Sequence, residues 1–269
     1  MRDRAGEVAK RLLRPLIPEA VAVRRYTQRF FATTAWKNLH LGVFESFAAA
    51  REFVAGRGTR PSYSIDHEAW LEKQGKLSAH DYAPLFWLGH AATAGCRVFD
   101  IGGSVGVTYL AYKKRLPLLA EVAWEVCELP DVVIRGAALA EKLDERALTF
   151  TTDMTRSDGC DVLFSAGALQ FIEEPIDLQL ERVTSRPRHV LINRLPVLAD
   201  HPTFVTLQNT GQSIAPCRVE HESSFFGRMS RLGYRLADRW KCFENSMTIP
   251  FHTGLHMESF QGFYFVRES

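Results

Sequence analysis

The segment that most constrains the fold is a glycine-rich loop between an apolar run and a helical segment, within residues 97–116. The apolar run ends in Asp100, and three glycines and a serine follow within six residues. Read as Gly-x-Ser-x-Gly, the loop is the nucleophile elbow of a hydrolase, with Ser104 as the attacking group. Read as Asp-x-Gly-x-x-x-Gly, it cradles a nucleotide with its backbone. Both interpretations require a strand before the loop and a helix after it.

Short apolar runs and helical segments alternate from residue 97 onward. The predicted strands are 97–101, 121–128, 148–153, 161–167 and 188–195. The predicted helices between them are 106–116, 131–144 and 175–185. A helix, a strand, a long insertion and a final strand complete the chain. This alternation predicts an α/β fold with a parallel sheet that helices cover on both faces.

Neither the standard hydrolase elbow nor the standard dinucleotide-binding loop matches this sequence in full. An elbow needs an oxyanion loop before it, which we do not find, and a later acid and histidine. His252 and His256 are late enough to serve, but an elbow gives Asp100 no role. A dinucleotide fingerprint needs glycine at positions 102, 104 and 107, and the last two are Ser104 and Val107. The hydride-transfer version of the nucleotide loop therefore fits poorly.

Three successive predicted strands end in an acid. Asp100 ends the first strand, Glu128 ends the second, and Asp153 ends the third. The carboxyl ends of parallel strands share one edge of the sheet, where open α/β folds bind ligands. An acid at the second strand end is the expected partner of ribose hydroxyls, and one at the third can accept a bond from an adenine amino group. This pattern favours the nucleotide interpretation.

The first 95 residues lack the alternation of short apolar runs and helical segments. Residues 7–31 mix basic and apolar residues, and two prolines divide them into short helical pieces. This arm either packs on the main domain or contacts an anionic membrane surface. Residues 36–95 are expected to be helical, with an apolar helix ending at Gly95 as its C-cap. We predict a helical N-terminal arm and cap over residues 1–95.

Composition and charge exclude several classes of protein. The net charge is +2, which gives the whole chain no basic character for binding nucleic acid. The five cysteines are scattered without metal-ligand spacing, so we expect free thiols in a reducing compartment and no metal site. No apolar run is long enough to span a membrane, and no secretory signal is found. These features predict a cytoplasmic protein, with peripheral contact to the inner membrane through residues 1–31 as an open alternative.

The successive motifs resemble those of class I S-adenosylmethionine (SAM)-dependent methyltransferases. The segments that carry the resemblance are "VFDIGGSVG", "CELPDVV", "LTFTTD" and "DVLFSAGALQFIEEP". With "GVFESFAAA", "LINRLPV" and "FVTLQNTG", they are similar to a family of bacterial methyltransferases often encoded near surface-polysaccharide or specialised-metabolite genes. The resemblance implies a Rossmann-like, mostly parallel seven-stranded sheet with its last strand antiparallel, over residues 96–269. It also implies SAM as cofactor and S-adenosylhomocysteine (SAH) as product.

The resemblance also implies a set of cofactor-binding residues. Asp100 and the glycine loop would form the wall around the methionine and ribose, Glu128 would hold the ribose diol, and residues after the next two strands would border the adenine and the methyl group. The full set is Asp100, Gly102, Gly103, Ser104, Gly106, Glu128, Leu129, Asp153, Met154, Ser165, Ala166 and Gln170. Ser104 departs from the glycine that many methyltransferases carry. It fits if its backbone angle is ordinary, and its hydroxyl could then cap the next helix.

The acceptor and any general base are less constrained. A hydroxyl acceptor needs a base to take its proton, whereas an amine or carboxylate does not always need one. The polar segment after the fifth strand is expected to form a substrate lid. Candidate catalytic residues are Arg194, which could hold an anionic substrate group or form a salt bridge, and His201 and His221. Candidate substrate residues are Tyr63, Tyr82, Asn193, Gln208 and Asn209.

The sequence thus predicts O-methylation of a small-molecule or glycan-type acceptor. Two alternatives stay open at this point, a serine hydrolase based on Ser104 and a non-catalytic binding module with the same fold. An apolar N-terminal arm would also suit a homodimer.

Overall fold

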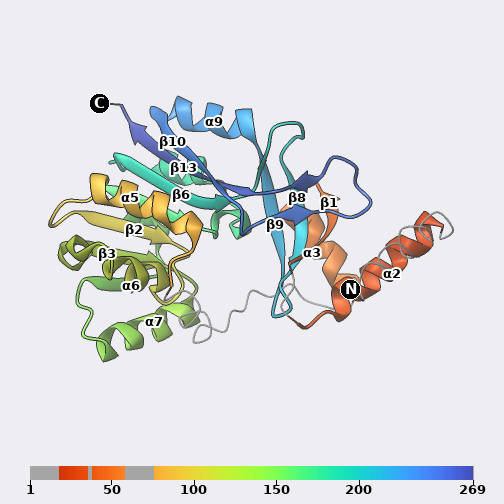
Figure 1. The fold of residues 1–269 in the computed structure, drawn as a ribbon, viewed down its shortest axis with the longest axis horizontal. Helices are drawn as coiled ribbons and strands as arrows, with labels where there is room; N and C mark the ends of the chain where they lie inside the picture. The colour runs from red at the N-terminus through yellow and green to blue at the C-terminus, as the bar shows by residue number, and fades with distance from the viewer. Residues whose placement is uncertain (1–17, 36–37, 58–75, 269) are drawn as a thin grey trace, which may run out of the picture.

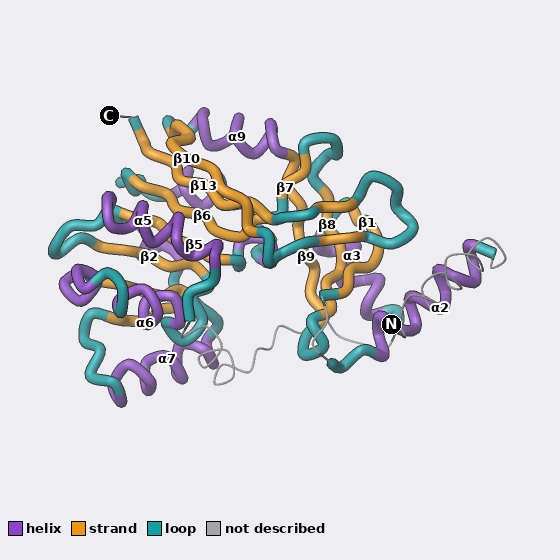
Figure 2. Tube along the Cα trace, viewed as in Figure 1, coloured by secondary structure: helices purple, strands orange, loops and turns teal. Residues whose placement is uncertain are grey.

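We describe a computed structural model of the chain, over residues 18–35, 38–57 and 76–268. Figures 1 and 2 show a large sheet with helices on both faces and a smaller sheet at one end of it. Among the described residues, no helix has both the length and the apolar character to cross a membrane. All five cysteines are buried and free.

The large sheet has seven strands in the order β10-β13-β6-β5-β2-β3-β4. Its strands are β2 (Arg97–Ile101), β3 (Ala123–Cys127), β4 (Leu148–Thr151), β5 (Val162–Ala166), β6 (His189–Leu195), β10 (Tyr234–Cys242) and β13 (Phe260–Arg267). The last strand, β13, is antiparallel to both of its neighbours, β10 and β6. All neighbouring strands from β6 to β4 in this order are parallel to each other. The predicted Rossmann-like class I methyltransferase topology is confirmed, including the antiparallel last strand.

Side chains of the central strands point alternately to the two faces of the sheet and pack in two separate apolar cores. In β2, Val98 packs on one face with α5 (Tyr82–Ala91), α6 (Val107–Lys113) and α7 (Pro130–Lys142). Phe99 packs on the other face with α8 (Ile176–Arg182) and α9 (Glu222–Arg231). Because both faces are covered, the central strands are apolar almost throughout, as parallel strands usually are.

A second sheet has four strands in the order β1-β8-β9-β7. The strands are β1 (Leu39–Phe44), β7 (Val197–Leu198), β8 (Phe204–Asn209) and β9 (Ile214–His221). The helices α2 (Glu19–Ala32) and α3 (Phe47–Ala55) pack against it through an apolar cluster around Phe30 and Leu207. In Figure 1, α2 extends away from both sheets.

The prediction that residues 36–95 are all helical is wrong for 39–44. These residues form β1, which pairs antiparallel with β8, so that Leu39 lies opposite Asn209. The next helix, α3, starts only at Phe47 after its N-cap Ser46. Gly95 is not a helix C-cap, because α5 ends at Ala91 with Ala92 as its cap. Tertiary pairing outweighed local periodicity here.

Buried ion pairs connect the small sheet to the large one. Arg218 of β9 pairs with Glu220 at 2.7 Å and donates to the backbone oxygens of Leu169 and Glu173, which follow β5. Arg228 of α9 bridges Glu220 and Asp177 of α8. The small sheet is therefore anchored to the segment after β5, beside the carboxyl edge of the large sheet. A further hairpin, β11 (Met247–Thr248) and β12 (His256–Met257), precedes β13.

Candidate functional site

The predicted cofactor residues lie at one edge of the large sheet. The chain runs from β2 through β3 to β4 in one direction, and then returns to place β5 and β6 on the other side of β2. This reversal between β2 and β5 is a topological switch point, where ligands bind at the carboxyl ends of the strands. Asp100, Glu128, Ala166 and Arg194 each lie at or next to such an end.

The loop after β2 turns tightly through two glycines with left-handed backbones. Gly102 has φ 72°, and Gly106 has φ 83° and is the N-cap of α6. A Cβ at Gly102 would overlap the side chain of Ala168, and one at Gly103 would overlap the Asp100 carboxyl. Ala168 follows β5, so the glycine at 102 is what lets the loops after β2 and β5 approach each other.

Ser104 differs from its expected conformation. Its φ is 56°, in the left-handed region that few non-glycine residues adopt, so its backbone angle is not ordinary. It does not cap α6 either, because the N-cap is Gly106 and no side-chain oxygen accepts there. The residue is 5% exposed, and its N–H donates to Glu128 Oε1 at 3.1 Å. Ser104 thus serves the loop through its backbone.

Asp100 is completely buried behind this loop. Trp124 Nε1 donates to its Oδ2 at 3.2 Å, while Oδ1 has no hydrogen-bond partner in the described chain. Burial raises the pKa of the Asp100 carboxyl from its ordinary 3.8 to about 7, partly opposed by the Trp124 bond. A buried acceptor oxygen without a partner, next to a ligand-type loop, suits a donor brought by a ligand.

The raised pKa of Asp100 predicts a dependence of stability on pH. Below pH 3.8 both the folded and the unfolded chain hold this proton, but between 3.8 and about 7 only the folded chain does. The unfolded state is therefore favoured increasingly as pH rises through this range. We expect the free energy of unfolding of the wild type, relative to Asp100→Asn, to fall by roughly 1–4 kcal/mol between pH 4 and pH 8. Urea unfolding at both pH values measures this difference, and an equal change in the two proteins would contradict it.

Glu128 follows β3 and joins it to the glycine loop. Its Oε1 accepts from Ser104 N, and its Oε2 accepts from Leu129 N at 2.9 Å. Burial raises the pKa of this carboxyl. Leu129 leaves the strand with 46% of its surface exposed, an apolar side chain open to solvent beside the acid. The pair offers a carboxylate for hydroxyls and an apolar surface for a flat ring.

Asp153, two residues beyond β4, is exposed. Asp153 is the N-cap of the short 3₁₀ helix Met154–Ser157, and its Oδ1 accepts from the backbone N–H and the hydroxyl of Thr155. The side-chain bond from Thr155, with the backbone bond, lowers the pKa of the Asp153 carboxyl. Met154, the next residue, packs partly against the core.

The residues after β5 are held by internal bonds. Ser165 is fully buried, and its hydroxyl donates to the backbone oxygen of Ile101 at 2.9 Å. Gln170 donates to Gly167 O at 3.0 Å, and its Oε1 has no partner in the described chain. Ala166 O accepts from the Arg194 guanidinium. These bonds fix the β5 loop close to the β2 loop.

Asn193 holds neighbouring elements together. Its amide nitrogen donates to His80 O at 3.1 Å, and its oxygen accepts from Trp240 at 2.9 Å and from the Cys242 thiol. These bonds occupy both ends of a side chain that is 1% exposed. The structure thus gives this candidate substrate residue a framework role.

The structure adds a polar group that the sequence did not indicate. The short 3₁₀ helix Ala79–Asp81 brings Asp81 to Tyr112, whose hydroxyl donates to Asp81 Oδ1 at 3.0 Å. His80 Nδ1 lies 3.1 Å from Glu244 Oε2, beyond the carboxyl end of β10. The capping box Ser78–Asp81 was the available signal, but it reports a helix start and not a site.

The remaining candidates lie elsewhere. His201 and His221 are on the small sheet, where His201 contacts Pro202 O and both ring nitrogens of His221 face Ser224 and Ala199. Gln208 and Asn209 are in β8. The amide of Asn209 donates to Phe30 O and Thr33 O, at the end of α2, and that of Gln208 donates to Asn38. Tyr82 is 61% exposed at the start of α5, and Tyr63 lies outside the described residues.

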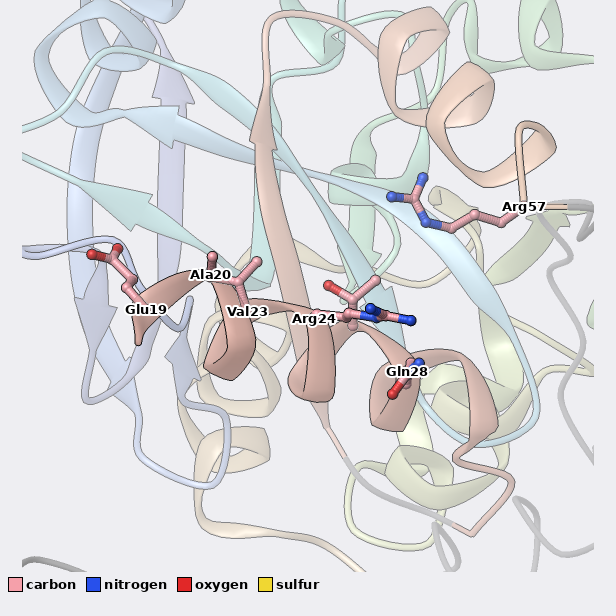
Figure 3. Close-up of a pocket in the computed structure, with 7 residues that line it drawn as sticks. Glu19, Ala20, Val23, Arg24, Gln28 and Arg57 are labelled. Atoms are coloured by element: carbon pink, nitrogen blue, oxygen red, sulfur yellow. The ribbon is translucent and has the colours of Figure 1, made fainter. Parts of the chain in front are cut away.

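A hollow of about 700 Å³ lies apart from these strand ends, beside α2. Figure 3 shows its lining side chains: Glu19, Ala20, Val23, Arg24, Thr27, Gln28 and Arg57. None of the predicted cofactor residues contributes to it. In the described part of the chain, no group of three or more histidines, cysteines or acids could hold a metal ion.

No protein-family model matches the chain, and no curated protein matches it either. Solved structures do resemble it. The N-terminal domain of EvdMO1, with SAH bound, is 13% identical, with 94% of this chain and 98% of that one covered and a TM-score of 0.48. The Burkholderia thailandensis 1,6-didemethyltoxoflavin-N1-methyltransferase is 16% identical, with coverages of 78% and 95% and a TM-score of 0.46.

The mitomycin 7-O-methyltransferase MmcR is 15% identical, with a TM-score of 0.44. The alignment covers 74% of this chain but 54% of that one, so the chain matches about half of that protein's length. At these identities and TM-scores the likeness carries no argument about this chain, whose fold is defined by its own strand order: a seven-stranded, mostly parallel Rossmann-like sheet.

Proposed function

We propose that the protein is a SAM-dependent methyltransferase. The observation that carries the proposal is the bond between Glu128 Oε1 and Ser104 N, at the switch point of the sheet. It holds a carboxylate against a glycine loop, so that one ligand can use the loop backbone and the acid together. A cofactor bound across this pair would place its ribose hydroxyls at Glu128, its adenine over Leu129 toward Asp153, and its sulfonium toward Ala166.

Two further residues of the predicted cofactor site support this placement of the cofactor. Asp100 Oδ1, near the end of β2, and Gln170 Oε1, after β5, are both buried and without a partner in the described chain. A buried polar atom left unpaired costs about 1–3 kcal/mol. The methionine end of the cofactor supplies an ammonium group, which would remove that cost.

The chemistry would be an in-line displacement, for which SAM supplies an activated methyl group. The protein must align the acceptor behind that methyl and exclude water. We propose O-methylation of a small-molecule or glycan hydroxyl, whose proton a base would take. His80, with Glu244 beside it, is connected to the strand ends through Asn193 and is a candidate for that base. His201 and His221 stay candidates from the small sheet.

Two further parts of the proposal concern organisation. Residues 96–269 would form the cofactor-binding domain, and residues 1–95 the cap, with β1 adding to the strands β7 to β9 to cover the acceptor side. We also predict a homodimer formed through the N-terminal arm. A further prediction is that residues 1–31 contact the inner membrane from a bacterial cytoplasm. Of this arm, the structure describes α2.

Isothermal titration calorimetry of the purified protein with SAH tests the proposal. We expect one site per chain with an affinity in the micromolar range, and no binding of NAD⁺ at tenfold higher concentration, because the loop lacks the dinucleotide spacing. Labelling of Ser104 by a fluorophosphonate probe, together with no heat from SAH, would favour the hydrolase instead. Binding of SAH without turnover on any acceptor would favour the non-catalytic module.

A further inference from the structure

Arg194 is held in a conformation that ordinary strand packing does not require. It is one of four described non-glycine residues with positive φ, at 63°, and Ser104 on the facing loop is another. The left-handed region is disfavoured by about 1–2 kcal/mol for such residues. Strained backbones of this kind concentrate at functional sites, where the surrounding structure holds them.

A bulge in β6 causes this conformation. Leu195 pairs with Gln261 and Ile192 with Phe263, so the two residues Asn193 and Arg194 stand opposite Gly262 alone. Bulges bend a strand and redirect its side chains, and they recur beside active sites. Asn193 remains in the buried framework, whereas Arg194 turns toward the loop after β5.

The loop after β5 is shaped to receive the guanidinium. Arg194 donates to Ala166 O, and a Cβ at Gly167 would lie 3.1 Å from Arg194 Nε and 3.2 Å from its Cζ. Gly167 itself has φ 80° and so needs to be glycine on conformational grounds as well. The cation thus lies flat against the carboxyl end of β5, near enough to Asp100 to lower the pKa of that carboxyl.

The guanidinium forms no ion pair in the described chain, although Asp100 is near enough for the cation to lower the pKa of its carboxyl. Within the same described residues, its Nε is buried without a hydrogen-bond partner. Other buried or partly buried arginines differ, since Arg218 pairs with Glu220, and Arg228 with Glu220 and Asp177. Cations that lose solvent are normally paired, so a partly buried guanidinium without an ion pair at a ligand edge leaves a position for an anion from outside.

We infer that Arg194 binds a carboxylate of a bound ligand. A planar guanidinium matches a carboxylate with two parallel bonds, and in the described chain only its Nη2 is engaged, by Ala166 O. The inference rests on the proposed function, which offers two sources of this group: the methionine carboxylate of the cofactor, or an acidic group on the acceptor. The position of Arg194 between β5 and β6 is compatible with both.

Calorimetry with two cofactor fragments separates these sources. SAH carries the methionine carboxylate, and 5′-methylthioadenosine carries the same nucleoside without it. If the cofactor is the source, Arg194→Met weakens SAH about 10- to 100-fold and leaves methylthioadenosine within twofold of the wild type. Arg194→Lys, which keeps the charge, recovers part of the loss. Arg188→Met, at the exposed amino end of the same strand, is the matched control and changes neither ligand.

If the acceptor is the source, SAH binds the wild type and Arg194→Met equally. Benzoate, a planar carboxylate probe, then quenches the tryptophan fluorescence of SAH-saturated wild type but not of Arg194→Met. Equal SAH affinity and equal benzoate response in both proteins overturn the inference. Should the methionine variant not fold, Arg194→Gln is used with the same readouts. Failure of the wild type to bind SAH and methylthioadenosine would reject the proposed function instead, and benzoate titration of the unliganded proteins would still test Arg194.

Discussion

Replacing Glu128 with alanine is expected to weaken SAH binding about 100-fold. The carboxylate accepts N–H bonds from Ser104 and Leu129, and in the proposed complex it also accepts both ribose hydroxyls. Hydrogen bonds to a charged group contribute about 1.5–3 kcal/mol each at most, and partial compensation by water leaves a net loss of about 3 kcal/mol. Calorimetry of the variant at pH 7.5 measures this loss directly.

A matched control separates this effect from a general loss of negative charge. Glu141 is exposed on α7 and away from the loop. Glu141→Ala should bind SAH as the wild type does, within twofold. If Glu128→Ala also binds SAH within a few-fold of the wild type, the ribose is not held by this acid, and the assignment of the β3 end is wrong.

Gly102→Ala should destabilise the fold by roughly 2–6 kcal/mol. The added methyl group would overlap Ala168, and the residue would keep a left-handed φ of 72° that alanine rarely adopts. Overpacking and backbone strain each cost about 1–3 kcal/mol, and here they act together. Urea unfolding followed by circular dichroism gives the difference in the free energy of unfolding.

Gly254→Ala isolates the contribution of the contact. Gly254 also has a left-handed backbone, with φ 83°, but no atom lies within 4 Å of the position of an added Cβ. It should therefore lose only the conformational part, about 1 kcal/mol. Equal losses in the two variants would mean that the loops after β2 and β5 are not in close contact.

The sequence predicted the large sheet well because its signals are local. Each central strand is a short apolar run, and the acids Asp100 and Glu128 mark where two of those runs end. Parallel strands then place these ends at one edge without further information. The glycine at 102 was identified from its motif, while the reason for it, the approach of Ala168, became clear only in the structure.

The small sheet could not be predicted in the same way. Leu39 pairs with Asn209, and no local pattern indicates a partner so far along the chain. The segment after β6 was expected to be a polar lid, whereas much of it forms the strands β8 and β9, which pair with each other. Secondary structure that depends on distant pairing is decided by tertiary context more than by propensity.

The polar groups around the site also depend on tertiary contacts that the sequence does not indicate. His80 and Asp81 are far from the motifs in sequence, and only the bonds to Asn193 and Tyr112 bring them to the strand ends. The strained backbones of Ser104 and Arg194 are equally invisible in the sequence, because neither residue type favours positive φ. Such local disagreements between sequence and structure are expected where a site demands them.

A crystal structure of the complex with SAH tests the central claim most directly. We expect both ribose hydroxyls to lie about 2.6–3.2 Å from the Glu128 carboxylate, with the adenine over Leu129 beside Asp153 and the sulfur directed toward the loop after β5. SAH bound in the hollow beside α2, or bound at the sheet with Glu128 turned away from its ribose, would contradict the account.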